Sequence, residues 1–447
     1  MPRMFGTDGV RGIANTEALS PELAFRLGRA AAATVQNRTG KRPVAVVGRD
    51  TRQSGPMLAA ALAAGIASGG VDVVDLAVVT TPAVAYVTTH IGAAFGVMIS
   101  ASHNPAPDNG IKFFSADGFK LPDAAEDQLE ALIRTMPDTL PRPTGRDLGT
   151  IRSAPEEVEA YVKHVVSTAR PLKGLRVVVD CGHGAAYKLA PEILKRLGAD
   201  VVALNTEPNG MNINAGCGST HPDELQKMVV VHQAHAGIAH DGDADRCIAV
   251  DERGGLVDGD QIMAICALDA HARGELAHDT LVATVMSNMG LDILLRKRGV
   301  QLVKAKVGDR YVLEEMQKGQ YLLGGEQSGH VIFGEYSTTG DGILTAVQLL
   351  SILARDARQL SELAGQMQHL PQWLENVKVT SKEGWDSKPA IAAAIRQAEE
   401  TLGDQGRILV RPSGTEPLIR VMLEGPGLDE IRAMAKQIKE VIVAELT

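Results

Sequence analysis

The sequence predicts an α/β protein of three similar mixed-sheet α/β domains plus a smaller C-terminal α+β domain, arranged around a central cleft. Three observations support this fold class. The length of 447 residues exceeds that of one domain, which is about 100 to 200 residues. A pattern of strand, loop, helix, glycine and strand occurs three times along the chain. The last part of the chain has a different character, typical of an α+β domain.

Each copy of the repeat contains a short apolar strand, a helix that ends at glycine, and a second apolar strand. These elements are residues 44–47, 56–68 and 71–74; 176–180, 189–197 and 199–202; and 281–285, 291–298 and 300–303. Short valine-rich strands joined by helices are typical of βαβ units, whose parallel strands are covered on both faces. Three α/β domains follow from the three copies.

The C-terminal part contains both tryptophans, Trp373 and Trp385, a helical stretch at 388–402, two strands around 411–417 and an amphipathic helix at 428–445. Helices packed against an antiparallel sheet are typical of a small α+β domain. Proline, glycine and turn residues predict joints near 137–149, 251–258 and 369–371. We therefore expect four domains, at residues 1–150, 151–255, 256–370 and 371–447.

Charge and composition exclude several classes of protein. The 45 basic and 54 acidic residues give a net charge of −9, which argues against the broad basic face that nucleic-acid binding requires. The sequence has no apolar run of about 18 residues, the length of a membrane span, and residues 1–12 lack an apolar signal region. We expect a cytoplasmic protein that binds neither nucleic acid nor membrane. The four separated cysteines favour reduced structural thiols.

Four loops carry residues suited to chemistry, and ligands of α/β sheets bind beyond the carboxyl ends of strands. The first loop, SASHNPAPDNG at 100–110, follows an apolar strand at 96–99. Pro105 and a following Asn-Gly pair constrain its backbone, so we expect Ser102 on an exposed loop, as a candidate nucleophile. In extended backbone His103 points to the opposite face, which disfavours a serine hydrolase. A serine that only caps a turn is the alternative.

The second loop, DGDADR at 241–246, lies between two predicted strands. Asp241, Asp243 and Asp245 can turn toward one point, where a cation relieves their repulsion. Arg246 stands where an EF-hand loop needs glycine, which excludes a calcium sensor of that kind. Mg²⁺ binds few protein carboxylates and completes its shell with water and phosphate oxygens, so the loop predicts Mg²⁺ and a phosphorylated partner. A solvated acidic turn is the alternative.

The third loop, GGEQSGH at 324–330, follows a predicted strand at 321–323. Glu326, Ser328 and His330 among glycines suit the binding of sugar hydroxyls or a proton transfer. A glycine-rich hairpin with an incidental histidine is the alternative.

The fourth loop, RPSGTEP at 411–417, is followed by Arg420. Two arginines, two hydroxyls and the N–H groups of a glycine-containing turn suit a phosphate. A tight turn with surface arginines is the alternative. Together the four loops predict phosphoryl chemistry on a phosphorylated polyol, in which catalysis is mainly positioning and charge neutralisation.

The chain resembles the α-D-phosphohexomutase family over nearly its full length, and most closely the bacterial phosphoglucosamine mutases. The resemblance is carried by FGTDGVRG at 5–12, SASHNP at 100–105 with NGIK at 109–112, DGDADR at 241–246, GEQSGH at 325–330 and RPSGTEP at 411–417. Gln327 after Glu326 and VGDRY at 307–311 are similar to the phosphoglucosamine branch. The family fold, three similar α/β domains and a smaller fourth, agrees with the repeats.

The resemblance implies a role for each motif residue. The ligands for Mg²⁺ would be Asp241, Asp243, Asp245 and a phosphate oxygen on Ser102. The catalytic residues would be the phosphoserine Ser102, the phosphoryl-binding Arg11 and Arg246, and the acid/base candidates Lys112 and His330. The substrate-binding residues would be Gly308, Glu326, Ser328, Arg411, Ser413, Gly414, Thr415 and Arg420.

The implied function is the interconversion of glucosamine 6-phosphate and glucosamine 1-phosphate through a phosphoserine and a bisphosphate intermediate. The expected partner is therefore a small-molecule sugar phosphate. Phosphoglucomutase or phosphomannomutase activity, a metal-dependent sugar phosphatase and a non-catalytic sugar-phosphate sensor are the alternatives. The sequence leaves the oligomeric state open, a homodimer included.

Overall fold

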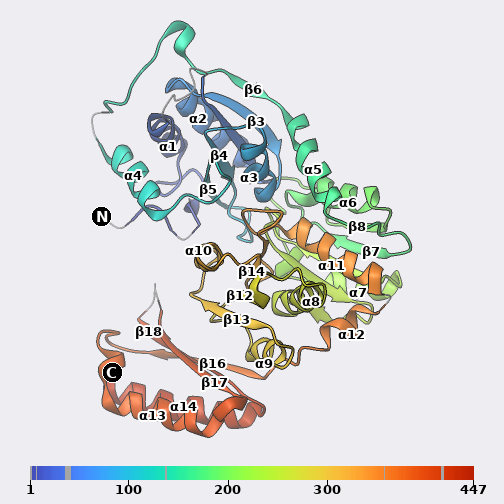
Figure 1. The fold of residues 1–447 in the computed structure, drawn as a ribbon. Coiled ribbons are helices and arrows are strands. Elements are labelled where there is room, and N and C mark those ends of the chain that lie inside the picture. Colours follow the sequence, from blue (N-terminus) through green and yellow to red (C-terminus); the bar gives the residue numbers. More distant parts are fainter. Residues whose placement is uncertain are drawn as a thin grey trace. The chain divides into compact units, whose positions relative to one another are not determined.

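The computed structural model describes residues 3–6, 8–35, 42–135, 138–356, 358–413 and 417–446. The chain divides into two compact units, Met1–Met286 with Val300–Gly365, and Ser287–Gly299 with Gln366–Thr447. Figure 1 shows their helices and strands. Three sheets lie in the first unit and one in the second.

The first sheet has six strands in the order β1-β5-β4-β2-β3-β6. Its strands are β1 (Val10–Ile13), β2 (Val44–Arg49), β3 (Asp72–Val78), β4 (Phe95–Ile99), β5 (Asp108–Ser115) and β6 (Ile151–Ser153). Its helices are α1 (Pro21–Thr34), α2 (Gly55–Ser68), α3 (Thr81–His90) and α4 (Asp123–Arg134). Alternate strand residues such as Val47 and Val97 join α1, α2 and α4 in one core, whereas α3 packs on β2 and β4 outside that core. Helices therefore cover both faces, which explains the continuous apolar strands.

The second sheet has five strands in the order β11-β10-β9-β7-β8. Its strands are β7 (Arg176–Asp180), β8 (Asp200–Leu204), β9 (Ala236–His240), β10 (Cys247–Asp251) and β11 (Leu256–Val257). The helices in this part of the chain are α5 (Val158–Ser167), α6 (Ala186–Arg196) and α7 (Asp223–Val231).

The third sheet has four strands in the order β13-β12-β14-β15. Its strands are β12 (Thr280–Thr284), β13 (Gln301–Ala305), β14 (Leu323–Gly325) and β15 (Val331–Phe333). The helices in this part of the chain are α8 (Gly259–Ala272), α9 (Met289–Lys297), α10 (Asp309–Gly319), α11 (Gly342–Asp356) and α12 (Leu360–Ala364). Of these helices, α9 belongs to the second unit.

The three sheets share one arrangement of four strands. The first strand of each repeat pairs in parallel with the second and with the third, and a fourth strand returns antiparallel to the third. These sets are β2 to β5, β7 to β10 and β12 to β15. The prediction of three similar mixed-sheet domains is therefore confirmed, and each contains a hairpin between its third and fourth strands.

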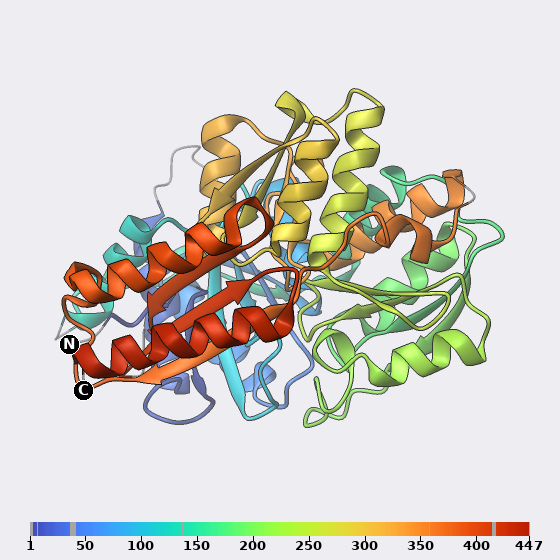
Figure 2. The ribbon, with the colours of Figure 1, turned by 90° about the horizontal axis from the view of Figure 1, so that it is seen from below.

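The second unit contains a three-stranded antiparallel sheet in the order β16-β18-β17. Its strands are β16 (Gln372–Lys378), β17 (Arg407–Pro412) and β18 (Leu418–Glu424), and its long helices are α13 (Pro389–Leu402) and α14 (Leu428–Leu446). Both helices lie side by side on one face of the sheet (Figures 1 and 2). This unit is the predicted α+β domain, with β16 as an additional strand.

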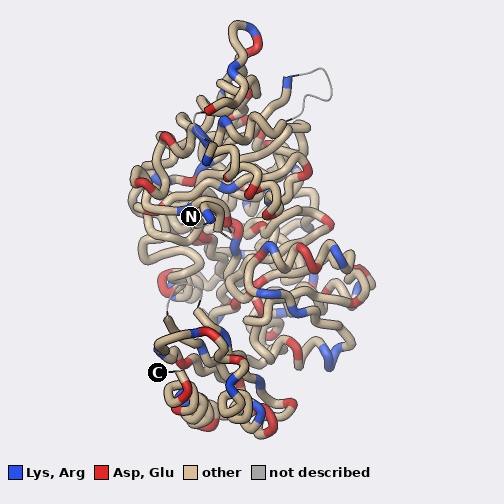
Figure 3. Tube along the Cα trace, turned by 90° about the vertical axis from the view of Figure 1, so that its left-hand side faces the viewer, with Lys and Arg blue, Asp and Glu red and all other residues tan. Residues whose placement is uncertain are grey.

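The distribution of charged residues and the cysteines agree with the composition. Lys and Arg are interspersed with Asp and Glu along the chain (Figure 3). All four cysteines are buried and free. Among the described residues, no helix combines the length and the apolar character needed to cross a membrane.

A buried carboxylate organises the second unit. Glu424 is 0% exposed, and its Oε2 accepts hydrogen bonds from the N–H of Met289 at 2.9 Å and from Nε of Arg407 at 2.7 Å. Met289 is the first residue of α9, where the helix dipole favours a negative charge. Glu424 therefore ties α9 to the sheet of the second unit.

Replacing Glu424 should destabilise this unit selectively. We expect Glu424→Ala to lower its free energy of unfolding by about 3 to 5 kcal/mol, because Arg407 then loses the partner of a buried ion pair. Both tryptophans lie in this unit, so urea unfolding followed by tryptophan fluorescence measures the change. Glu375→Ala removes the more exposed pair with Lys439 and should cost less than about 1 kcal/mol. Equal effects of the two substitutions would contradict this assignment.

Candidate active site

Three of the predicted loops occupy the same place in their sheets. Residues 100–107 join β4 to β5, residues 241–246 join β9 to β10, and residues 326–330 join β14 to β15. Each hairpin leaves the carboxyl end of a parallel strand, where α/β sheets bind ligands. β14 extends to Gly325, two residues beyond the predicted strand, so two of the loop's glycines belong to the sheet.

Ser102 contacts the aspartate loop directly. Its Oγ donates a 2.6 Å hydrogen bond to Oδ2 of Asp241, and its N–H donates to Oγ of Ser100 at 2.9 Å. The residue has a left-handed φ of 51° and is 1% exposed. The prediction of an exposed serine is wrong, because the aspartate loop from the second sheet packs against it.

His103 lies nearer to the serine hydroxyl than predicted. Its Nδ1 is 3.4 Å from Oγ of Ser102. The prediction that the two side chains point to opposite faces assumed an extended backbone, and the left-handed φ of Ser102 makes it wrong. Burial, and then the charges of Arg246 and Arg11, lower the pKa of His103, which favours its neutral form. Asp241 remains the closer partner of the hydroxyl.

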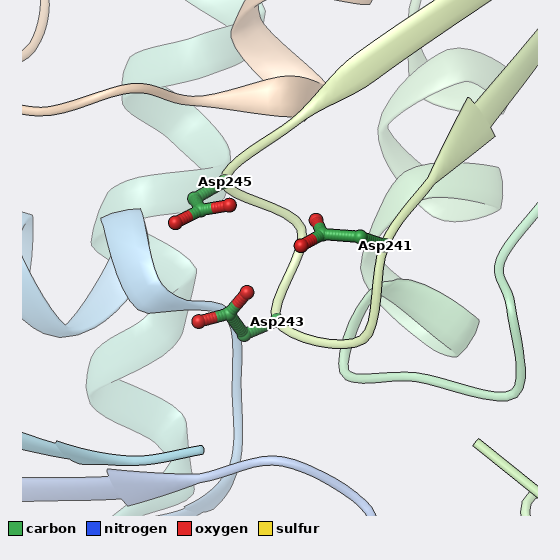
Figure 4. A group of neighbouring side chains, drawn as sticks. All are labelled: Asp241, Asp243 and Asp245. Atoms are coloured by element: carbon green, nitrogen blue, oxygen red, sulfur yellow. The ribbon is translucent and has the colours of Figure 1, made fainter. Parts of the chain in front are cut away.

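The carboxylates of Asp241, Asp243 and Asp245 converge, as Figure 4 shows. One oxygen of each lies within 4.8 Å of the others, and all three residues are buried. Burial, and then the charges of Asp245 and Asp243, raise the pKa of Asp241 well above its ordinary value. Within the described part of the chain, Oδ1 of Asp243 and Oδ1 of Asp245 lack hydrogen-bond partners. This donor set fits a hard divalent cation, and its burial contradicts the solvated acidic turn.

Lys112, on β5, supplies a buried positive charge beside the triad. Its Nζ lies 2.9 Å from Oδ2 of Asp243, 3.0 Å from Oδ2 of Asp8 and 3.8 Å from Oδ2 of Asp245. Burial lowers the pKa of Lys112, but the carboxylates of Asp243, Asp8 and Asp245 outweigh burial and raise it above its ordinary value. Lys112 is therefore charged in the folded protein.

His330 connects the triad to the start of α10. Its Nδ1 is 3.7 Å from Oδ2 of Asp245, and its Nε2 is 3.5 Å from Oδ2 of Asp309. The N–H of Gly340 donates to Nε2 at 3.1 Å, so the neutral ring carries its proton on Nδ1, toward Asp245. Burial lowers the pKa of His330, whereas Asp245 and Asp309 raise it, and the net shift is upward.

Arg11 and Arg246 offer guanidinium groups at the same site. Arg11 pairs with Asp8, and Nε of Arg246 is 3.9 Å from Oδ1 of Asp245. The Nε atoms of both arginines are buried without a hydrogen-bond partner among residues that the structure describes. Spare guanidinium donors suit the oxygens of a phosphoryl group.

Asp8, Lys120 and Asp309 link these residues into one charge network, and none was predicted as a site residue. Lys120 Nζ is 2.7 Å from Oδ1 of Asp8 and also pairs with Asp309. Burial raises the pKa of Asp8, but Lys112, Lys120 and Arg11 hold it well below its ordinary value. Asp8 and Asp309 lie inside segments that carry the family resemblance, so a sequence signal existed for them. Lys120 lies outside every motif.

The predicted sugar-binding residues of the third sheet lie together. The N–H of Gly308 donates to Oε1 of Glu326 at 3.1 Å, and Oγ of Ser328 lies 3.3 Å from Oε2 of Glu326. The glycine has a left-handed φ of 124°. The loop does form a glycine-rich hairpin, as the alternative interpretation of the sequence expected. His330 is nevertheless part of the site, because it faces the aspartate triad.

The predicted phosphate loop lies in the second unit. Arg411 on β17 and Arg420 on β18 are directly opposite each other, so their side chains share one face of the sheet. The carbonyl of Ser413 accepts a hydrogen bond from Nζ of Lys382 at 2.6 Å, and Lys382 was not predicted. Gly414 and Thr415 lie outside the described residues. Like charges opposite each other on a sheet are unfavourable, and an anion between them would relieve the repulsion.

Four family models match the chain in order. They are described as phosphoglucomutase/phosphomannomutase alpha/beta/alpha domain I at residues 2–139, domain II at 159–255, domain III at 258–370, and the C-terminal domain at 374–441.

Similar proteins match over the whole chain or nearly all of it. A phosphoglucosamine mutase of Symbiobacterium thermophilum is 73% identical over 446 residues, 100% of each chain. A phosphoglucosamine mutase of Desulforudis audaxviator is 57% identical over 425 residues, 95% of this chain and 94% of its own. The crystal structure of a phosphoglucomutase/phosphomannomutase family protein from Burkholderia thailandensis has a TM-score of 0.82 at 25% identity, covering 99% of this chain and 98% of that chain. The present chain therefore belongs to the phosphoglucomutase/phosphomannomutase family, the α-D-phosphohexomutases.

Proposed function

We propose that the protein interconverts glucosamine 6-phosphate and glucosamine 1-phosphate through a phosphoserine at Ser102 and a bisphosphate intermediate. The observation that carries this proposal is the 2.6 Å hydrogen bond from Oγ of Ser102 to Asp241. It places a serine hydroxyl at the edge of a buried carboxylate triad. A relative that is 73% identical over the full chain bears the name phosphoglucosamine mutase.

Positive charge is the main requirement of this chemistry, because a phosphate carries about −1.5 to −2 charges at neutral pH. Mg²⁺, if bound at the aspartate triad, would supply part of it by neutralising charge on the transferred group. The proposed ligands of Mg²⁺ are Asp241, Asp243, Asp245 and a phosphate oxygen on Ser102. The other proposed positive charges are those of Lys112, Arg11 and Arg246.

The reaction consists of two phosphoryl transfers in opposite directions. In the first, the bond between phosphorus and Oγ of Ser102 breaks, and a bond forms between phosphorus and the free sugar hydroxyl oxygen. The hydroxyl gives up its proton, and Oγ gains one. Lys112 and His330 are the acid/base candidates for these protons. The bisphosphate then turns over, and Ser102 takes back the other phosphoryl group.

The remaining motif residues would bind the rest of the substrate. Glu326, Ser328 and the backbone at Gly308 offer acceptors and donors to sugar hydroxyls and the amino group. The residues proposed to bind the substrate's own phosphate are Arg411, Ser413, Gly414, Thr415 and Arg420. Guanidinium groups suit this role because they bind phosphate oxygens bidentately.

Removing the nucleophile tests the covalent step. We expect Ser102→Ala to abolish interconversion of the two glucosamine phosphates while preserving the fold, because the variant lacks the hydroxyl proposed to accept the phosphoryl group. A coupled assay for glucosamine 1-phosphate measures turnover. Ser115→Ala is the control, because the Ser115 hydroxyl contacts only the carbonyl of Phe119 in the described structure, at 3.3 Å. Turnover by Ser102→Ala would contradict the proposal, and stoichiometric release of inorganic phosphate by the unaltered protein would identify a phosphatase.

Metal binding should stabilise the first unit. At Mg²⁺ concentrations about 100 times Kd, we expect a gain of about 2.7 kcal/mol, seen as a rise in Tm relative to protein treated with a chelator. Asp243→Asn should remove this rise. Asp117→Asn, at an exposed turn position, should preserve it. A Tm that does not respond to Mg²⁺ would argue against the metal site.

Truncation of Arg420 tests the phosphate loop. We expect Arg420→Ala to weaken substrate binding by about 2 to 5 kcal/mol, the cost of breaking a buried charge pair. The change should appear in KM for glucosamine 6-phosphate. Arg396→Ala on the exposed face of α13 should leave KM unchanged. The phosphate-binding role fails if KM is the same in Arg420→Ala and in the unaltered protein.

A further inference from the structure

A single buried arginine fastens the backbone of the serine loop. Arg52 lies in the loop between β2 and α2, and its side chain is 0% exposed. Its Nη2 donates to the carbonyl oxygens of Ser102 at 2.9 Å and Asn104 at 2.8 Å. Its Nη1 donates to the carbonyl oxygens of Pro105 at 2.5 Å and Asp108 at 3.0 Å. One planar guanidinium therefore binds four backbone carbonyls between Ser102 and Asp108, the first residue of β5.

Asp50 neutralises this arginine and reaches the other side of the serine. Its Oδ2 accepts hydrogen bonds from Nε of Arg52 at 2.8 Å and from Oγ of Ser100 at 2.6 Å. The N–H of Ser102 donates to that same Ser100 Oγ at 2.9 Å. The buried ion pair thus fixes both the N–H and the carbonyl of Ser102, the first through Ser100.

A residue in the loop after β8 also donates a hydrogen bond to the carbonyl of Ser102. Nδ2 of Asn214 donates to the carbonyl of Ser102 at 2.9 Å and to that of Asn104 at 3.2 Å. A Cβ at Gly242, in the aspartate loop, would lie 2.5 Å from the Ser102 carbonyl oxygen and 2.9 Å from Nδ2 of Asn214. The serine carbonyl therefore lies in a tight space between loops that leave strands of the first and second sheets.

These contacts explain how Ser102 keeps an unfavourable backbone conformation. A left-handed φ in a residue other than glycine costs about 1 to 3 kcal/mol and persists only where its surroundings enforce it. Relaxation of φ would turn Oγ of Ser102 away from Asp241. Phosphoryl transfer is sensitive to such a change, because a displacement of about 1 Å can cost 100-fold in rate.

We propose that Asp50, Arg52 and Asn214 are positioning residues for phosphoryl transfer, which aim Oγ of Ser102 at the aspartate triad by holding its backbone. This inference rests on the proposed function. None of the three contacts Oγ in the described structure, so each acts through the serine peptide. They should therefore affect the transfer rate and leave substrate binding unchanged.

Asn214→Ala tests this proposal by kinetics. Asn214 has a left-handed φ of 57°, which alanine adopts less readily than asparagine, so a melting curve first checks that the variant is folded. We expect kcat to fall about 10- to 100-fold, while KM for glucosamine 6-phosphate stays within twofold of the unaltered protein. Asn212→Ala is the matched control in the same loop. Nδ2 of Asn212 donates to the carbonyl of Glu207 at 3.0 Å, and kcat should stay within twofold. An Asn214→Ala enzyme with unchanged kcat, or an equal loss in Asn212→Ala, would overturn the positioning role.

Arg52→Lys is the second variant, because lysine keeps the charge beside Asp50 but cannot reach four carbonyls. We expect a fall in kcat of about 100-fold and a shifted ³¹P resonance of phosphorylated Ser102, prepared with glucosamine 1,6-bisphosphate. A folded Arg52→Lys protein with unchanged kcat and resonance would overturn the proposal for Arg52. If this variant does not fold, the Asn214→Ala kinetics decide.

Turnover by the unaltered protein distinguishes failure of the proposed function from failure of the positioning role. Absence of turnover in the unaltered protein would overturn the proposed function itself. Normal turnover with unaffected variants would overturn only the positioning role.

Discussion

Buried negative charge is the constraint on which the rest of the active site depends. Asp241, Asp243 and Asp245 are held together away from solvent, and an uncompensated buried ion costs several kcal/mol. Lys112 compensates part of this charge. Lys112 is in turn shared with Asp8, which also binds Lys120. The negative charge that remains would suit a divalent cation.

The repeated sheet explains how distant segments reach this site. In each sheet of the first unit, the hairpin between the third and fourth strands carries candidate site residues. In the first two sheets, a residue of a βα loop donates hydrogen bonds to backbone carbonyls of that hairpin. Arg52, after β2, holds the serine loop, and Ala185, after β7, donates its N–H to the carbonyl of Gly242 at 2.8 Å in the aspartate loop. These two βα loops, unlike the βα loops that often bind ligands in such sheets, contact the backbone of a neighbouring hairpin.

Much of the fold could be predicted because its signals are local. The helix predicted at 56–68 is α2 (Gly55–Ser68), and the one predicted at 388–402 is α13 (Pro389–Leu402). The sequence pattern does not predict β16, because QWLENVK lacks the strict alternation of apolar and polar residues that indicates a strand, and Leu374 is 48% exposed. Such an edge strand becomes stable only through pairing with β18, which no local pattern reveals.

The sequence by itself determined which residue types are available: the serine, the alternating aspartates, the glycine-rich polar loop and the arginine pair, each in a short contiguous motif. Only the tertiary structure decided that Ser102 is buried, that its backbone is left-handed, and that Asp8, Lys120 and Asp309 complete the charge network. The physical reason is that motifs record local chemistry. Burial, electrostatic compensation and backbone strain arise instead from side chains such as Arg52 and Asn214, which reach the serine from distant parts of the chain.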